Sequence, residues 1–260
     1  MTPLLHTLAA LSRSEDAYLA TADENWLQGR TIYGGLIGAL SVAAARAELP
    51  GLPPLRSAQF VFVGPAAGPV SLHPQLLRQG RSASFVSVDV MADGALSARA
   101  LLTFAAPRQS RHSFQDLPAP TAPPPDKGFA LFDAPGAPRS TSNFDGRFVG
   151  GGIPFSGAAR PELLLWLRHK NAAPHDEAAL VALADASPPA VFPIFAQPAP
   201  ISTVNWSIDL FAEPPPPTDW LLTQTSSTHV QDGTSVQLTR MWTADGAPIL
   251  EARQLVALYD

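Results

Sequence analysis

The sequence predicts an α+β fold made of two similar halves, each a curved antiparallel sheet around a central helix. Three observations support this prediction. The strand-like segment around Gln59 has a counterpart around Asn205, and the Asp-Gly turn at 93–94 has a counterpart at 245–246. In both halves the segments follow the order of a strand, an apolar helix and four strands. A chain that carries one fold twice usually packs the copies together, so the groove between them is the first place to look for a site.

The first half is predicted to contain one buried helix. Residues 34–49 are apolar nearly all round until Arg46, and the run ends at Pro50-Gly51, which is a strong stop signal. Its small side chains would let a curved sheet approach closely. An Asp-Gly turn between β-rich runs predicts a hairpin. The strands of this half are expected at 17–26, 56–63, 70–79, 84–91 and 96–104.

The second half gives a matching set of elements. Residues 177–185 predict a helix that stops before Pro188-Pro189. The run 162–168 predicts a strand, although taken alone it is also compatible with a helix. The other strands are expected at 202–211, 220–229, 235–243 and 249–258.

Proline separates the two halves. The chain has 28 prolines in 260 residues, and many lie between Pro107 and Pro138. Because proline lacks a backbone donor and is excluded from helix interiors, this stretch predicts an irregular linker. We therefore divide the chain into an N-terminal unit over 1–105, a proline-rich linker over 106–150 and a C-terminal unit over 151–260.

Composition excludes several classes of function. The net charge of −5 and the lack of a basic run argue against nucleic-acid binding. The absence of cysteine excludes disulfides, cysteine nucleophiles and thiolate metal sites. Apolar runs are interrupted well before the ~18 residues that a membrane span needs, and the N-terminus is a poor signal peptide. These features fit a cytoplasmic protein.

A buried helix wrapped by a curved antiparallel sheet is the hotdog arrangement, and two tandem copies can pair edge to edge as a double hotdog, which covers exposed edge strands. The ordered short motifs of both halves strengthen this interpretation. They are Tyr33-Gly34-Gly35, the alanine-rich helix, Gly80-Arg81-Ser82, Asp185-Ala186-Ser187-Pro188-Pro189, Trp220-Leu221-Leu222, Ser227-Thr228, Asp245-Gly246 and Gln254. With these motifs the chain resembles the acyl-CoA thioesterase II family of double-hotdog hydrolases. The resemblance implies hydrolysis of fatty acyl-CoA to free acid and CoA, a role in fatty acid metabolism, and no metal or cofactor other than the CoA of the substrate.

The resemblance also implies a catalytic set. The family holds a water with an Asp, a Ser or Thr, and a Gln of the C-terminal hotdog. In this chain the Thr matches Thr228, the Gln matches Gln254, and the Asp position falls on Asn205. An amide orients water by hydrogen bonds but cannot act as a general base. The expected catalytic residues are therefore Asn205, Thr228 and Gln254, with a low rate expected.

The start of the first helix is the expected oxyanion site. Free N–H groups and a positive dipole end lie at a helix N-terminus, and Gly34 and Gly35 carry no side chain to obstruct a thioester carbonyl. The alternative interpretation of the two glycines is a tight entry into the helix with no ligand. The remaining candidate substrate contacts are Tyr33, Gln59, Gly80, Arg81 and Ser82, of which the last three form a turn that would either meet CoA phosphates or be an ordinary charged hairpin.

The sequence therefore predicts an acyl-CoA thioesterase with an acyl-CoA as its small-molecule partner. The alternative is a non-catalytic acyl-CoA- or lipid-binding hotdog protein, which the replacement of the family Asp by Asn205 favours. A hotdog hydratase or dehydratase ranks third, because Tyr33-Gly34-Gly35 supplies no His or Asp at the helix start. Paired hotdog sheets often assemble further, so a homo-oligomer is compatible with this fold.

Overall fold

The N-terminal half contains one long helix and the strands that surround it. The structure is a computed structural model that describes residues 1–134 and 136–259. The elements of this half are α1 (Leu4–Ala9), β1 (Ser12–Ser14), β2 (Ala17–Thr21), a 3₁₀ turn (Glu24–Trp26), β3 (Leu27–Gln28), β4 (Thr31–Ile32), α2 (Gly34–Glu48), β5 (Leu55–Phe62), β6 (Pro69–Gln79), β7 (Ala83–Ala92) and β8 (Ala95–Ala105). Asp93 and Gly94 join β7 to β8 with φ angles of 50° and 75°, as the predicted two-residue hairpin requires. The strand predicted over 17–26 is shorter and ends at Thr21.

The C-terminal half repeats this arrangement around a shorter helix. Its elements are β9 (Phe129–Ala130), β10 (Phe144–Gly151), β11 (Glu162–His169), α3 (Glu177–Ala184), β12 (Ile201–Leu210), β13 (Leu221–Gln231), β14 (Thr234–Trp242) and β15 (Pro248–Leu258), with 3₁₀ turns at Pro125–Lys127, Arg139–Asn143 and Phe192–Ile194. Asp176 caps the start of helix α3, because its Oδ1 accepts the N–H of Ala179 at 3.1 Å. The segment over 162–168, which is ambiguous in sequence, is a strand.

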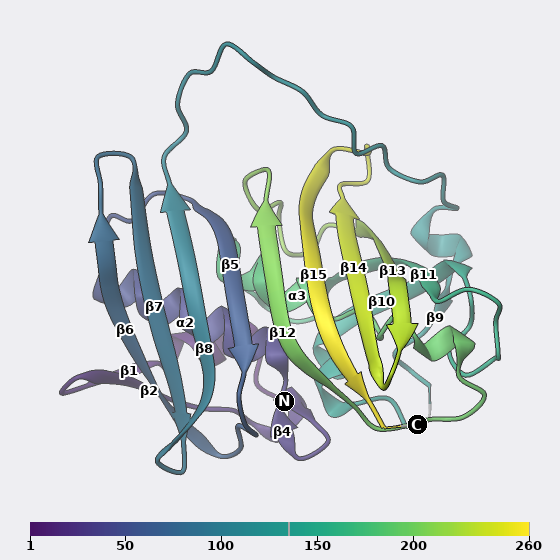
Figure 1. Cartoon of the computed structure of the whole chain (residues 1–260), viewed down its shortest axis with the longest axis horizontal. Helices are drawn as coiled ribbons and strands as arrows, with labels where there is room; N and C mark the ends of the chain where they lie inside the picture. The colour runs from purple at the N-terminus through teal and green to yellow at the C-terminus, as the bar shows by residue number, and fades with distance from the viewer. Residues whose placement is uncertain (135, 260) are drawn as a thin grey trace.

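One antiparallel sheet joins the two halves. Within the described residues its thirteen strands follow the order β1-β2-β6-β7-β8-β5-β12-β15-β14-β13-β11-β10-β9, and a second small sheet contains β3 and β4 (Figure 1). The seam lies between β5 and β12, where Gln59 pairs with Ser207. Beneath the seam the rings of Phe60 and Trp206 stack with their centroids 5.2 Å apart, and both side chains are buried. The predicted α+β double hotdog is confirmed.

Helices α2 and α3 are covered by this sheet and run in opposite directions. At the start of α2, the hydroxyl of Tyr33 donates to the carbonyl of Ala182 near the end of α3 at 2.8 Å. At the other end of the pair, Arg46 of α2 and Glu177 of α3 form an ion pair with an N···O distance of 2.7 Å. The two contacts bring the start of one helix next to the end of the other.

A glycine lets the two helices approach each other. At Gly38 a Cβ atom would lie 2.7 Å from Cγ1 of Val181, which is closer than real Cβ contacts. Helix α2 is therefore built from small residues where it meets α3, as its composition predicts. In the described part of the chain, none of the helices has both the length and the hydrophobicity needed to cross a membrane.

The proline-rich linker is shorter than the predicted 106–150. Residues 144–151 form β10, which pairs with β11, and the two-residue strand β9 pairs with β10. The last proline of the linker is Pro138, and beyond it Phe144, Gly146 and Phe148 alternate as buried residues of a half-buried strand. The predicted end of the linker at residue 150 was therefore wrong, because this strand belongs to the sheet. The division of the chain into an N-terminal and a C-terminal unit stays a prediction.

The linker lies against the outer face of the C-terminal half. The indole N–H of Trp166 donates to the carbonyl of Pro123 at 2.8 Å, and that of Trp242 donates to the carbonyl of Leu117 at 2.9 Å. These bonds satisfy two tryptophan donors that would otherwise face an apolar surface.

Candidate active site

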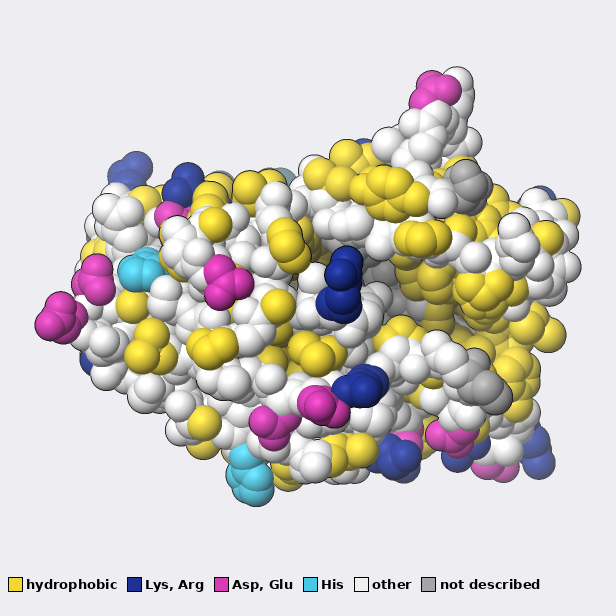
Figure 2. All heavy atoms as spheres, turned by 90° about the horizontal axis from the view of Figure 1, so that it is seen from below, with side chains coloured by type: hydrophobic (Ala, Val, Ile, Leu, Met, Phe, Trp, Pro, Cys, Tyr) yellow, Lys and Arg dark blue, Asp and Glu magenta, His cyan; other side chains and the backbone are white. Residues whose placement is uncertain are grey.

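A cavity of about 400 Å³ lies between the two halves. Seen from below, the molecule is hollowed between its halves, with basic side chains beside the hollow (Figure 2). The N-terminal half contributes the β3–β4 hairpin, the start of α2, and residues of the β5 and β8 region. The C-terminal half contributes the segment after α3 and the inner faces of β12 to β15. The lining includes Gln28, Thr31, Gly34, Ile37, Phe62, Asp185, Ser187, Thr203, Thr225, Gln237, Thr239 and Gln254.

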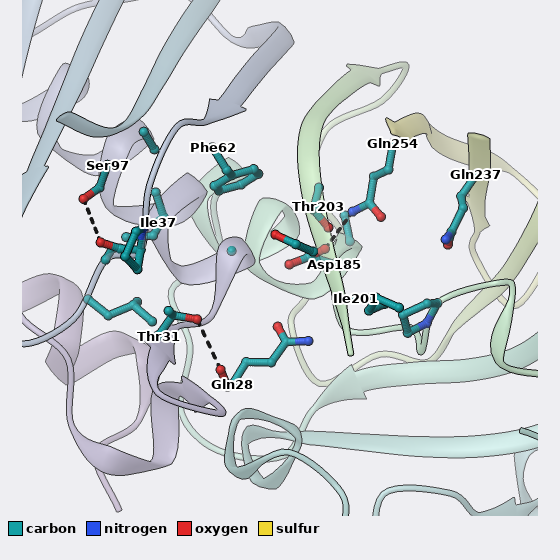
Figure 3. A pocket seen from close by; sticks show the side chains of 18 of the residues that line it. Gln28, Thr31, Ile37, Phe62, Ser97, Asp185, Ile201, Thr203, Gln237 and Gln254 are labelled. Carbon is teal, nitrogen blue, oxygen red and sulfur yellow. Dashed lines mark hydrogen bonds between the residues drawn. The ribbon is translucent and has the colours of Figure 1, made fainter. Parts of the chain in front are cut away.

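Asp185 is the carboxylate at the centre of this cavity. It is the residue that ends α3, and its two oxygens accept from different elements (Figure 3). Oδ2 accepts the backbone N–H of Gly35 at 2.8 Å, and Oδ1 accepts the side-chain N–H of Gln254 at 2.8 Å. One carboxylate thus joins the start of α2, the end of α3 and the last strand.

The antiparallel helix pair explains this position. An acidic side chain is disfavoured at the C-terminal end of its own helix, where the dipole is negative. Here the positive end of α2 lies opposite, because Tyr33 and Ala182 hold the two helix ends together. The N–H of Gly35 therefore compensates the unfavourable end of α3.

Burial makes the Asp185 carboxyl a weaker acid than usual. Loss of solvent raises its pKa from 3.8 to about 6, and the hydrogen bonds from Gln254 and Gly35 oppose that rise. A carboxylate with a pKa near 6 is ionised at neutral pH and still accepts a proton readily. This is the behaviour expected of a general base.

Hydroxyl groups line the wall beside Asp185. Thr225 on β13 is buried, and its hydroxyl donates to Ser187 at 2.8 Å and lies 3.3 Å from the hydroxyl of Thr239 on β14. Ser187 follows Asp185 by two residues, so this contact also ties the segment after α3 to the sheet.

Gly34 supplies a backbone donor to the same cavity. The N–H of Gly35 is taken by Asp185, and those of Leu36 and Ile37 reach the carbonyl of Tyr33. In the described part of the chain no group accepts the N–H of Gly34. A Cβ at Gly34 would lie 3.0 Å from Oδ2 of Asp185, so a side chain there would crowd the carboxylate. The first turn of α2 therefore presents a free N–H beside an acid.

The structure brings together only part of the catalytic set expected from the sequence. Gln254 lines the cavity together with Gly34, and Gly35 binds the central carboxylate. Asn205 and Thr228 are exposed and are not among the residues that line the cavity.

The strand geometry explains why these two residues lie elsewhere. Trp206 points into the core, so its neighbour Asn205 faces outward, beside the 47% exposed Val61 on β5. Thr228 sits at a β-bulge in the exposed end of β13. The threonine of this strand that lines the cavity is Thr225, three residues earlier.

The predicted substrate contacts also lie outside the cavity lining. Tyr33 is buried, with its hydroxyl bound to Ala182, so it supports the helix pair; burial and the charge of Asp185 raise its pKa well above the usual value. Gln59 is exposed on β5 at the seam. The turn of Gly80, Arg81 and Ser82 joins β6 to β7, away from the lining residues.

Asp185 is a candidate site residue that the sequence analysis did not single out. It appears there only as the first residue of a resemblance motif. A signal was present, because an acid that directly follows an apolar helix opposes the helix dipole and needs a reason to be there. The partner that compensates it, Gly35, is 150 residues away.

Comparison with known proteins agrees with this architecture. Residues 22–105 match the profile of the acyl-CoA thioesterase N-terminal domain, and residues 114–258 match that of the acyl-CoA thioesterase C-terminal domain. No curated protein matches the chain.

Several solved structures share the fold over nearly the whole chain. A conserved protein of unknown function with a hot dog fold from Alicyclobacillus acidocaldarius is 25% identical, with a TM-score of 0.91 and coverage of 100% of this chain and 99% of that one. The TesB protein of Mycobacterium avium subsp. paratuberculosis is 18% identical, with a TM-score of 0.82 and coverage of 98% of each chain. The acyl-CoA thioesterase II TesB2 of Mycobacterium marinum is 20% identical, with a TM-score of 0.80 and coverage of 98% and 97%.

The resemblance drawn from the short motifs is thereby confirmed. Because the two domain profiles together span most of the sequence, the chain belongs to the acyl-CoA thioesterase family.

Proposed function

We propose that this protein hydrolyses acyl-CoA thioesters to the free acid and CoA, with Asp185 as the general base. The observation that supports this most is the meeting of a half-buried carboxylate and a free helix N–H in one cavity between the halves. Family membership supports thioester hydrolysis in general. The assignment of roles to residues is part of the proposal, and so is the absence of any metal or further cofactor.

The first step is the activation of water. Gln254 donates to Oδ1 of Asp185, which leaves its own Oε1 to accept a hydrogen from a water in the cavity. The same water donates its second hydrogen to the Asp185 carboxylate. As the water oxygen bonds to the thioester carbon, its proton passes to Asp185.

The second requirement is a donor for the oxyanion. When water adds to the carbonyl, negative charge gathers on the carbonyl oxygen. The N–H of Gly34 is free and points from the positive end of α2, so it is the group we assign to this oxygen.

The tetrahedral intermediate then collapses and the C–S bond breaks. The leaving CoA thiolate takes the proton that Asp185 holds, which regenerates the carboxylate and releases neutral CoA thiol. A protonated carboxyl with a pKa of about 6 is acidic enough for this transfer, since an ordinary thiol has a pKa of about 8.5.

Release of free thiol from a panel of acyl-CoA thioesters tests the proposal. We expect turnover by the wild type and a loss of about a hundredfold or more in Asp185→Asn, because the amide cannot take the proton. Asp209→Asn is the matched control, since it removes the same charge from an exposed position of β12. Full activity of Asp185→Asn, or no thiol from any acyl-CoA, would contradict the proposal.

The two other readings of the sequence give different outcomes in the same assay. A non-catalytic binding protein was favoured by the replacement of the family Asp by Asn205, but Asp185 places a carboxylate in the cavity. Tight binding of acyl-CoA without thiol release would still favour that reading. Addition of water to an enoyl-CoA without thiol release would favour a hydratase.

A further inference from the structure

Gln237 carries a buried donor that the catalytic scheme does not use. It lies on β14, is 2% exposed and lines the cavity. Its Oε1 accepts the backbone N–H of Ala190 at 2.8 Å, which fixes the orientation of the amide. Its Nε2 is buried and, within the described residues, has no hydrogen-bond partner. Because an unpaired buried donor costs free energy, this nitrogen needs a partner that the protein itself does not provide.

The strand around Gln237 is polar where its counterpart is apolar. The inner face of β14 presents Ser235, Gln237 and Thr239, all buried. On the corresponding strand of the first half, β7, the inner face presents the buried side chains of Val86, Val88 and Val90. One copy of the duplicated fold thus keeps hydrocarbon against its helix, and the other lines the cavity with polar groups.

Gln237 lies at the enclosed end of the cavity. It is the cross-strand partner of Gln254, which binds Asp185. Gln28, on the opposite side of Asp185 in Figure 3, is exposed on the β3–β4 hairpin. In a thioester held at Asp185, the bulky CoA part would therefore lie toward Gln28 and solvent, and the acyl part would lie toward Gln237.

We propose that Gln237 makes the enclosed end of the cavity a subsite for an uncharged oxygen atom of the acyl group, so that the enzyme favours short hydroxyacyl-CoA or oxoacyl-CoA thioesters over saturated ones of the same length. The inference rests on the proposed hydrolysis and adds the substrate class to it. The free Nε2 donates to the acyl oxygen, and the hydroxyls of Thr225 and Thr239 complete a polar wall.

The charge and the size of the cavity limit which acyl groups it can accept. The cavity lining, as far as the described residues form it, contains no Lys or Arg, and Asp185 is itself acidic, so an acyl carboxylate would be repelled. A donor such as Nε2 does not attract a cation. The cavity of about 400 Å³ is at the lower end of the usual range for ligand sites, which favours a short chain.

The test compares kcat/KM for three acyl-CoA thioesters of equal length, one saturated, one with a hydroxyl group and one with a ketone. We expect the wild type to favour at least one oxygenated substrate by about tenfold or more, since a site built to hydrogen-bond a substrate group rejects analogues that lack it. In Gln237→Leu this ratio should fall to about one. Gln224→Leu is the matched control, because Gln224 bonds to Glu162 and is not part of the lining, so its ratio should equal that of the wild type.

The ratio of kcat/KM for the oxygenated substrate to kcat/KM for the saturated one separates this inference from the proposed function. No thiol release from any of the three substrates counts against hydrolysis itself. Thiol release with a wild-type ratio of one or lower overturns the subsite and leaves hydrolysis standing. An unchanged ratio in Gln237→Leu would also overturn it. If Gln237→Leu does not fold, as a thermal melt will show, the wild-type ratio decides alone.

Discussion

The rate of thioester hydrolysis should fall as the pH drops below about 6, because Asp185 then holds a proton and can no longer accept one from water. The cause is burial, which raises the pKa of this carboxyl from 3.8. An ordinary aspartate would stay ionised well below that pH.

The size of the effect follows from the pKa. With a pKa of about 6, about nine tenths of the sites are ionised at pH 7 and about one tenth at pH 5, so kcat/KM should fall about tenfold between these two pH values and about tenfold for each further pH unit below pH 5. A base with the unshifted pKa of 3.8 would lose less than about a tenth of its activity at pH 5.

The assay is kcat/KM for one acyl-CoA from pH 4.5 to 8, with the released thiol detected by a dithiodipyridine reagent that reacts in acid. Circular dichroism at each pH confirms that the chain stays folded. In Gln254→Leu the acid limb should move to higher pH, because the bond from Gln254 lowers the pKa of Asp185. A flat profile between pH 5 and 8, or a limb near pH 4 in the wild type, would refute the assignment of Asp185 as the base.

Three further predictions concern stability and are checked by urea unfolding. Asp185→Asn should raise the free energy of unfolding at pH 8 by about 1–3 kcal/mol, because a raised carboxyl pKa means that stability is lost as the pH rises from 3.8 to about 6; a destabilised variant would contradict this. His169 is buried and its pKa is lowered to about 4, so the chain should lose on the order of 3 kcal/mol as the pH falls from 6.5 to about 4, and His169→Gln should flatten this dependence. Gly35→Ala should cost about 1–3 kcal/mol or more, because its Cβ would lie 2.6 Å from the ring of Tyr33. Gly80→Ala, in an exposed turn, should change stability by less than about 0.5 kcal/mol.

The elements of this fold were predictable because their patterns are local. The apolar run from Gly34 and the stop at Pro50 gave a helix that the structure has over Gly34–Glu48. The repeated Asp-Gly dipeptide was a less reliable guide. At 93–94 both residues have positive φ and form a two-residue hairpin, whereas at 245–246 only Gly246 does, in a longer loop. Asp232 and Gly233, with φ of 50° and 70°, form the other tight hairpin.

The site was harder to predict because its residues meet only through the packing of distant elements. Matching the two halves along the chain drew attention to Gln59 and Asn205. Both lie on the exposed face of the seam strands, and neither is part of the cavity lining. The position of Asp185 depends on two helices that pack antiparallel, and this arrangement leaves no periodic trace in the sequence. Gln254 was found by resemblance, and its bond to Asp185 needed coordinates.

The ion pair of Arg46 with Glu177 has a consequence for the number of substrate molecules that one chain can bind. Antiparallel helices in a duplicated fold create two places where a helix start adjoins a helix end. At the second place the carboxylate of Glu177 is bound by Arg46 and also accepts the N–H of Leu55, and neither Arg46 nor Glu177 lines the cavity of Asp185. Each polypeptide should therefore process one substrate at a time, and titration with a tight inhibitor should saturate at one equivalent per chain.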